Sequence, residues 1–515
     1  MKKIKLYITA FLTAVLFVAG CDKGFDEINT SKTGFTSLDP TFVLNSSVIN
    51  VTERNARSYL AQTHTIIQWL INPFGSSFQG ANYNQWSNFQ NDPWNSFYNS
   101  AAQRVVEVVY RTKDDPSKSN LYNAARIWKV YVFQQITDAY GDVPYSEAGL
   151  GFYEKIITPV YDTQKDIYMH LLKELDEASA ALDPAKGVIG GEILFGGNVA
   201  RWKKYGYSML LRTAMRLSKI DPATAETYVK KAVAGGLMES NDDNAWIRHT
   251  TEFDNKLGTE VSGTERGNYY ITKTFVDFLK STNDPRLGKL TRRYVGAPNQ
   301  PGQTDNRITK DPALQIGQPI GYDNITLGGR ATADGLVSLF DYSQVDWNLF
   351  FINTSPEFHC TYGQTQLLLA EAIVRGWVTG DASVAFANAV KANMQLYALF
   401  NSAASVSEAD IDAYIAANPL DMSSTEASLE QINGEYWVGS FPNGAEGWAN
   451  WRRSGYPVLP VNTYPGSQIP GEFIRRHIYP IAEQINNRAN YDAAISRQFA
   501  GKGDKMNFRV WWDKE

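Results

Sequence analysis

The chain has 515 residues, of which 43% are hydrophobic and 20% charged. This balance is typical of a globular protein and argues against disorder. The formal net charge is −5, and it becomes −8 when the lysines at positions 2, 3 and 5 are removed with a leader. A mildly acidic chain lacks the basic surface that nucleic acid requires, so we expect no nucleic-acid partner.

The N-terminus carries the signature of export. Three lysines precede an apolar stretch from Leu6 to Gly20, which is shorter than the roughly 20 residues needed to span a bilayer. The ending Val18-Ala19-Gly20-Cys21 resembles a bacterial lipobox, in which the cysteine sulfur receives lipid. We therefore predict a signal peptide over residues 1–20 and lipidation of Cys21, which would tether the mature chain to a membrane. The alternative is an ordinary signal peptide that happens to contain a cysteine.

An aromatic and amide-rich segment follows between residues 72 and 98. It contains Pro73, Gly75, Gly80 and Pro93, which predict a loop rather than a helix. Flat apolar rings beside amide groups suit a sugar, because rings stack while amides bind hydroxyls. The alternative is a packed loop whose rings cover helix ends. The ligand-binding candidates from this segment are Phe78, Asn82, Tyr83, Gln85, Trp86 and Trp94, and a second loop supplies Tyr342 and Trp347.

Most of the remaining chain has helical periodicity. Residues 161–182 place apolar side chains three and four positions apart, with Thr163 as a capping residue. Further helices are predicted over 202–218, 223–234, 366–375 and from Asp381 onward, in helix–turn–helix units of the tetratricopeptide kind. Residues 241–267 and 292–358 are rich in Gly, Pro, Asn and Thr and are expected to be loops with short strands. Cys360 has no partner for a disulfide once Cys21 carries lipid, so we expect it to be buried.

Several ordered motifs resemble the SusD/RagB family of nutrient-binding outer-membrane lipoproteins of Bacteroidetes. They are the start at Cys21–Thr30, Asp138–Ala148, Pro159–Gln164, Leu210–Leu217, Asn283–Leu287, Leu369–Ala372, Gly447–Pro457, Pro480–Gln484 and Arg509–Asp513. The resemblance covers nearly the whole chain. It implies a mostly α fold of tetratricopeptide-like helical pairs with an irregular, loop-rich half that carries the ligand. We expect one body over residues 21–515, with helical pairs mainly in 40–236 and 360–455 and loop-rich ligand-side segments at about 72–98, 241–358 and 455–480.

The resemblance also implies a function. Such proteins form a lid over a SusC-type TonB-dependent transporter and deliver a glycan, or in some members a peptide, into its barrel. The acidic residues Asp22, Asp26 and Glu27 resemble the signal that sends these lipoproteins to the cell exterior, although Lys23 and Gly24 interrupt the run. We expect an outer-membrane protein anchored by lipid on Cys21. The alternatives are a peptide ligand, or a helical-repeat scaffold that docks protein partners without a nutrient.

Catalysis is not expected. Zinc-binding, nucleophile-elbow and phosphate-loop motifs are absent from the sequence, and the five histidines are isolated. A pair of carboxylates for glycoside hydrolysis cannot be recognised from sequence alone. No cofactor or metal is predicted, with calcium in the Asn/Asp-rich loops as the alternative. We assign structural roles to the family motifs around Asp142 and Trp451–Arg453 and to the pair Glu371 and Arg375.

Overall fold

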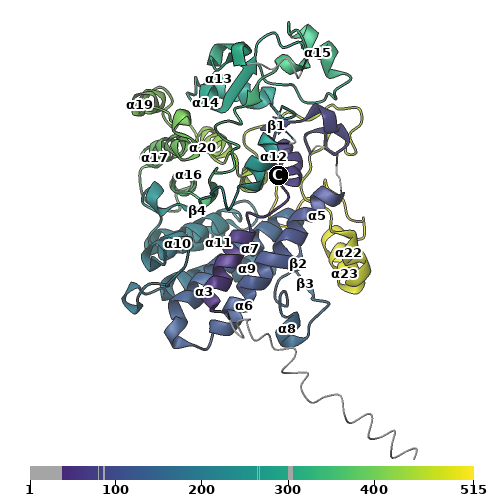
Figure 1. Ribbon diagram of the computed structural model, residues 1–515. Coiled ribbons are helices and arrows are strands. Elements are labelled where there is room, and N and C mark those ends of the chain that lie inside the picture. The colour runs from purple at the N-terminus through teal and green to yellow at the C-terminus, as the bar shows by residue number, and fades with distance from the viewer. Residues whose placement is uncertain (1–37, 79, 85–86, 264, 266, 300–304) are drawn as a thin grey trace, which may run out of the picture.

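The computed structural model describes residues 38–515 except 79, 85–86, 264, 266 and 300–304. Helices dominate the described chain, and the strands are short (Figure 1). The predicted signal peptide and Cys21 lie outside the described residues. Among the described helices, none combines the length and apolarity needed to cross a bilayer.

A first block of helices forms the lower half of the molecule in Figure 1. Its main helices are α3 (Pro40–Asn50), α6 (Gln103–Thr112), α7 (Ser119–Tyr140), α9 (Gln164–Ala181), α10 (Val199–Met215) and α11 (Pro222–Gly235). Each packs against the next along the chain. Thr163 caps α9 by accepting a hydrogen bond from the backbone N–H of Asp166. Asn198 caps α10 in the same way, by accepting from the backbone N–H of Arg201. The predicted helices in this region are confirmed, with ends shifted by a few residues.

A second block contains α16 (Tyr362–Val374), α17 (Ala382–Gln395), α18 (Tyr397–Phe400), α19 (Glu408–Ala417), α20 (Thr425–Gly439) and α21 (Gly444–Ser454). Helix α16 packs on α17, on α20 and on α10 of the first block. Thr361 and Gln364 form a capping box at the start of α16. The mostly α fold of stacked helical pairs is therefore confirmed.

The remaining elements are short. The helices are α4 (Ala56–Tyr59), α5 (Ser87–Ser96), α8 (Gly151–Glu154), α12 (Lys256–Ser262), α13 (Lys273–Ser281), α14 (Leu287–Leu290), α15 (Leu327–Ala333), α22 (Ile481–Asn486) and α23 (Arg488–Phe499). The strands are β1 (Leu70–Ile71), β2 (Val143–Pro144), β3 (Tyr161–Asp162), β4 (Ala245–Ile247), β5 (Tyr270–Ile271), β6 (Thr291–Tyr294), β7 (Ile308–Thr309), β8 (Gln344–Val345) and β9 (Glu357–Cys360). The order β1–β5–β8–β6–β7 makes one sheet, and β2–β3 and β4–β9 are antiparallel pairs.

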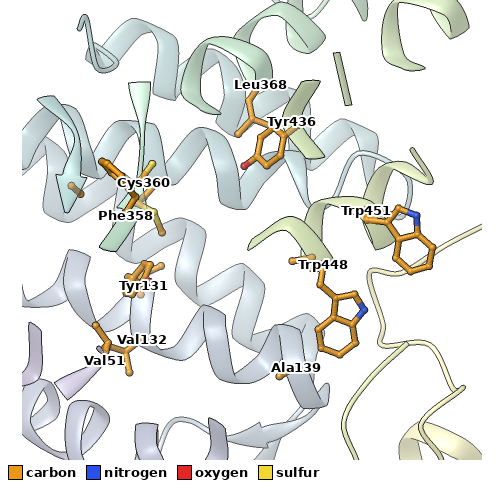
Figure 2. Close-up of a cluster of buried hydrophobic side chains, with 14 of the residues drawn as sticks. Val51, Tyr131, Val132, Ala139, Phe358, Cys360, Leu368, Tyr436, Trp448 and Trp451 are labelled. Carbon is orange, nitrogen blue, oxygen red and sulfur yellow. The ribbon is translucent and has the colours of Figure 1, made fainter. Parts of the chain in front are cut away.

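One core runs through both blocks. Figure 2 shows side chains from α7, β9, α16, α20 and α21 in one cluster, including Tyr131, Cys360, Tyr436 and Trp448. Cys360 is a buried free thiol, as expected.

Buried ion pairs tie α21 to its neighbours. The Arg453 guanidinium donates to both carboxylate oxygens of Glu371 on α16, each at 2.7 Å. Glu446 accepts from Arg216 at 2.7 Å and from the Tyr436 hydroxyl at 2.6 Å. Burial alone would raise the pKa of Glu371, but the guanidiniums of Arg453 and Arg375 lower it to about 2. These groups therefore have structural partners, in line with the roles predicted for the motifs.

The segment 72–98 is only partly a loop. Its first part contains the short turns Pro73–Phe78 and Gly80–Asn82, but α5 begins at Ser87 and continues through Pro93. A π-helical stretch, η4 (Phe97–Ala102), follows directly and leads into α6. Proline lacks the N–H that a helix interior uses, so α5 has one backbone hydrogen bond fewer at Pro93. The prediction of a loop over the second part of this segment is therefore wrong.

Candidate ligand-binding face

Three segments far apart in sequence meet at the loop-rich end of the molecule. They are residues 72–84, residues 319–342 and residues 460–470, and we call their common surface the three-loop face. The backbone N–H of Asn324 donates to the Pro73 carbonyl at 3.1 Å, which joins the first two segments. The Tyr464 hydroxyl lies 3.3 Å from a carboxylate oxygen of Asp323, which joins the second and third.

Amide side chains hold the first and third segments together. The Asn462 side chain donates to Asn82 Oδ1 at 3.1 Å, and its backbone N–H donates to the Tyr83 hydroxyl at 3.3 Å. The Gln468 N–H donates to Asn84 Oδ1 at 3.1 Å. The Tyr83 ring packs edge-on against Phe473 with centroids 5.4 Å apart. Asn82, which the sequence analysis names as a ligand-binding candidate, therefore connects two loops.

The exposed aromatic surface of this face is a stacked pair. Phe74 is 41% exposed, and its ring stacks on half-buried Phe340 at 6.1 Å with 22° between the planes. Asn72 fixes the start of the turn by accepting from the Phe74 N–H at 2.9 Å. Half-buried Tyr322 and Tyr464 lie on the same segments. An exposed ring held flat by a second ring is a suitable platform for a sugar.

Asp323 places a carboxylate beside the Tyr464 hydroxyl on this face. One of its oxygens accepts from the N–H groups of Ile325 and Thr326 at 3.1 and 2.8 Å. The hydrogen bonds from Thr326 and Ile325 lower the pKa of Asp323, so it is ionised at neutral pH. The other oxygen faces the Tyr464 hydroxyl, and a carboxylate in this position can accept hydrogen bonds from hydroxyl groups of a ligand.

Five predicted ligand residues are buried instead. Trp94 is 5% exposed on α5, and its ring packs against Tyr140, Tyr161 and Tyr479. Tyr342 is fully buried and donates to Asp334 at 2.7 Å. Trp347 is 2% exposed and stacks on Tyr294 at 6.3 Å. Asn82 and Tyr83 are fully buried as well. Burial of these five side chains counts against direct contact with a ligand, and their role in ligand binding stays a prediction.

The other three candidates are not decided by the structure. Phe78 lies in the turn Pro73–Phe78 of the three-loop face, and its side chain is outside the described part. Gln85 and Trp86 are outside the described residues. The sequence reasoning did not select Phe74, Phe340 or Asp323 as ligand residues. Two features of the sequence point to the segments that carry these residues. They are the turn Asp323-Asn324-Ile325-Thr326 and the loop-rich composition of the segments.

A second candidate is a hollow of about 920 Å³ on the side of the helical blocks. It lies between α3, α10, β4 and α17–α18, and half-buried Trp246 lines it, stacked on Phe358 at 5.8 Å. Arg201 and Arg248 also line it and have no ion-pair partner among the described side chains. This hollow combines aromatic rings with two arginines and with the carboxylate of exposed Asp242. Its Trp246 ring is half-buried, whereas Phe74 of the three-loop face is an exposed ring.

Two buried histidines are uncharged in the folded chain. His64 and His477 are buried, and burial lowers their pKa to about 4 and about 3, so both are neutral at physiological pH. Within the described residues, no group of three or more His, Cys, Asp or Glu side chains is placed to hold a metal ion.

The comparisons with known proteins agree with this architecture. A sequence model of the SusD-like type, described as starch-binding associating with outer membrane, matches residues 32–480. The chain belongs to the SusD-like family. The family description names starch binding and association with the outer membrane.

Solved structures support the same assignment. A chitin-binding protein is 32% identical with a TM-score of 0.81, and the match covers 93% of this chain and 100% of that one. A SusD-like protein labelled Bacteroidetes AC2a is 28% identical with a TM-score of 0.79, over 93% and 100% of the two chains. A chitin-binding SusD homologue from Flavobacterium johnsoniae shares the fold at 22% identity and a TM-score of 0.73, over 92% and 99%. A comparison with curated proteins returned no match.

Proposed function

We propose that this SusD-like protein is a lipoprotein of the outer membrane, anchored through Cys21, that captures a glycan and passes it to a SusC-type TonB-dependent transporter. The observation that carries the proposal is the stacked pair Phe74 and Phe340 on the face that also carries Asp323, whose neighbour Asn324 is hydrogen-bonded to the Pro73 carbonyl. A flat exposed ring and a nearby acceptor match the two faces of a sugar, which is apolar on its C–H side and polar at its hydroxyls.

The family assignment supports a carbohydrate ligand. The family is described as starch-binding, and a structural relative that is 32% identical is a chitin-binding protein. The inferred ligand class is an oligosaccharide, held by stacking and by hydrogen bonds to hydroxyl groups.

Weak binding suits this role. Phe74 is open to solvent, so a sugar stacked on it buries only one face. Such sites give affinities on the order of micromolar to millimolar. A ligand bound this loosely is released readily to a transporter.

The test is a glycan array on the Cys21→Ser chain, followed by isothermal titration with the oligosaccharides that bind, starch and chitin fragments included. We expect saturable binding of at least one glycan. Binding of peptides but no glycan would show that the ligand is a peptide. If nothing binds while a transporter still co-purifies with the lipidated chain from outer membranes, the scaffold alternative is correct.

A further inference from the structure

An exposed apolar cluster lies at the end of the molecule opposite the three-loop face. Phe152 on α8 is 77% exposed, and Ile157 in the following loop is 87% exposed. Beside them are the half-buried rings of Tyr110, on α6, and Tyr153. We call these four residues the α8 cluster, and we propose that it inserts into the surface of the lipid bilayer that carries the anchor. The proposal rests on the proposed lipidation of Cys21.

The cluster is built to hold Phe152 outward. The rings of Tyr110 and Tyr153 stack at 4.1 Å with 22° between their planes, and Phe152 meets Tyr153 edge-on at 5.2 Å. The Tyr110 hydroxyl donates to Glu154 at 3.3 Å, which ties α8 to α6. Lys155 then adopts a left-handed conformation with φ 62°, so the chain turns at the end of α8 before Ile157. The two tyrosines thus support a turn whose apolar tips face away from the core.

The side chains around the cluster are those that favour a membrane interface. The Lys113 ammonium lies 4.3 Å from the centre of the Tyr110 ring, and the Lys155 ammonium lies 5.4 Å from that of Phe152. Tyrosine and lysine both have an apolar body and a polar end, so they bridge the boundary between acyl chains and water. Exposed Asp114 and Glu154 balance the two lysines. Attraction must therefore come from insertion of apolar side chains, and it should depend little on salt.

The position of the chain start selects the bilayer as the partner. The Leu38 carbonyl accepts from the Arg111 guanidinium at 2.6 Å, and Arg111 follows Tyr110 on α6. The residues that connect the body to Cys21 therefore join it beside the α8 cluster. In Figure 1, α3, α6 and α8 occupy the same end, while α15 of the three-loop face lies at the other.

A second contact with the bilayer would strengthen the attachment that the lipid anchor provides. Residues 22–37 reach at most about 3.5 Å each, or roughly 55 Å, so lipid on Cys21 keeps the cluster near the bilayer without pressing it there. Membrane attachment through one lipid group is strengthened by a second signal on the protein surface. The α8 cluster would supply that signal and orient the body.

The experiment uses the full lipidated chain in vesicles of phosphatidylethanolamine and phosphatidylglycerol. An environment-sensitive nitrobenzoxadiazole dye is attached to Ile157→Cys, and in a matched control to Ile325→Cys. Ile325 is 83% exposed and precedes α15 at the opposite end. Cys360 is buried, so the added cysteine takes the label. Flotation of the vesicles first shows that the protein is anchored.

For the floated protein we expect blue-shifted emission at position 157 and about twofold quenching by brominated lipids, unchanged in high salt, with neither effect at position 325. Equal, water-like emission at the two positions would refute the membrane contact alone. A shift at 157 that needs a co-reconstituted transporter and is insensitive to brominated lipids would assign the cluster to a protein interface and also overturn the proposal. Failure to float would refute the lipid anchor, and the membrane proposal would fall with it.

Discussion

The helical framework and the three-loop face are held together by different forces. In the framework, fully buried charges pair across helices, as Arg453 does with Glu371 and Arg216 with Glu446. At the three-loop face, hydrogen bonds join the described parts of the loops without a buried ion pair between them, as Asn462 does with Asn82 and Tyr464 with Asp323. Losing one member of a buried ion pair leaves a charge without compensation, whereas losing an exposed ring costs little. Changes in the framework should therefore affect stability, and changes on the exposed part of the face should affect binding.

A large loss of stability is expected from Arg453→Ala. The substitution leaves the Glu371 carboxylate, which is fully buried, with Arg375 as its remaining guanidinium partner. Removing one partner of a buried pair costs about 3–5 kcal/mol. Urea unfolding should show the loss. The matched control is Arg488→Ala, which breaks an exposed pair with Asp492 and should leave the unfolding midpoint unchanged. Equal effects of the two substitutions would contradict the proposed difference between buried and exposed pairs.

Trp94→Ala tests whether Trp94 belongs to the buried framework or to a ligand-binding surface. Its enclosed ring predicts a loss of about 3–5 kcal/mol of folding free energy, as for other buried tryptophans. Trp451→Ala should behave alike, because Trp451 is also 5% exposed and donates to the Pro457 carbonyl at 3.2 Å. Circular dichroism melting measures both. A Trp94→Ala chain with wild-type stability and no glycan binding would return Trp94 to the ligand site.

The pH dependence of stability tests the burial of His477. Burial lowers the pKa of His477 to about 3, while in the unfolded chain it is near 6.5. Between these values the unfolded state binds the proton and the folded state does not, so stability falls as the pH drops below about 6.5. Each such histidine contributes a slope of about 1.4 kcal/mol per pH unit. His477→Phe should remove one such contribution from urea unfolding measured between pH 7 and 5. An unchanged slope would mean that His477 is protonated in the folded chain.

The sequence could predict the framework because its signals are local. The spacing of apolar residues between 161 and 182 and the cap at Thr163 are contained within one helix, and α9 forms there. The ligand side could be predicted only as a set of loop-rich segments. Whether Trp94 faces solvent depends on Tyr140, Tyr161 and Tyr479, which are remote in sequence. The pairing of Phe74 with Phe340 likewise arises only after the chain has folded.

The assignment of the ligand site to the three-loop face is tested most directly by isothermal titration. One glycan selected on the array is titrated into the Phe74→Ala and Trp246→Ala variants, both made in the Cys21→Ser chain. Phe74→Ala should weaken binding by about 1 kcal/mol, or roughly fivefold, because one aromatic face is lost. The melting temperature should stay close to that of the parent chain, and Trp246→Ala should bind as the parent does. Unchanged affinity in Phe74→Ala together with lost binding in Trp246→Ala would move the site to the hollow beside β4 and contradict the assignment of the three-loop face.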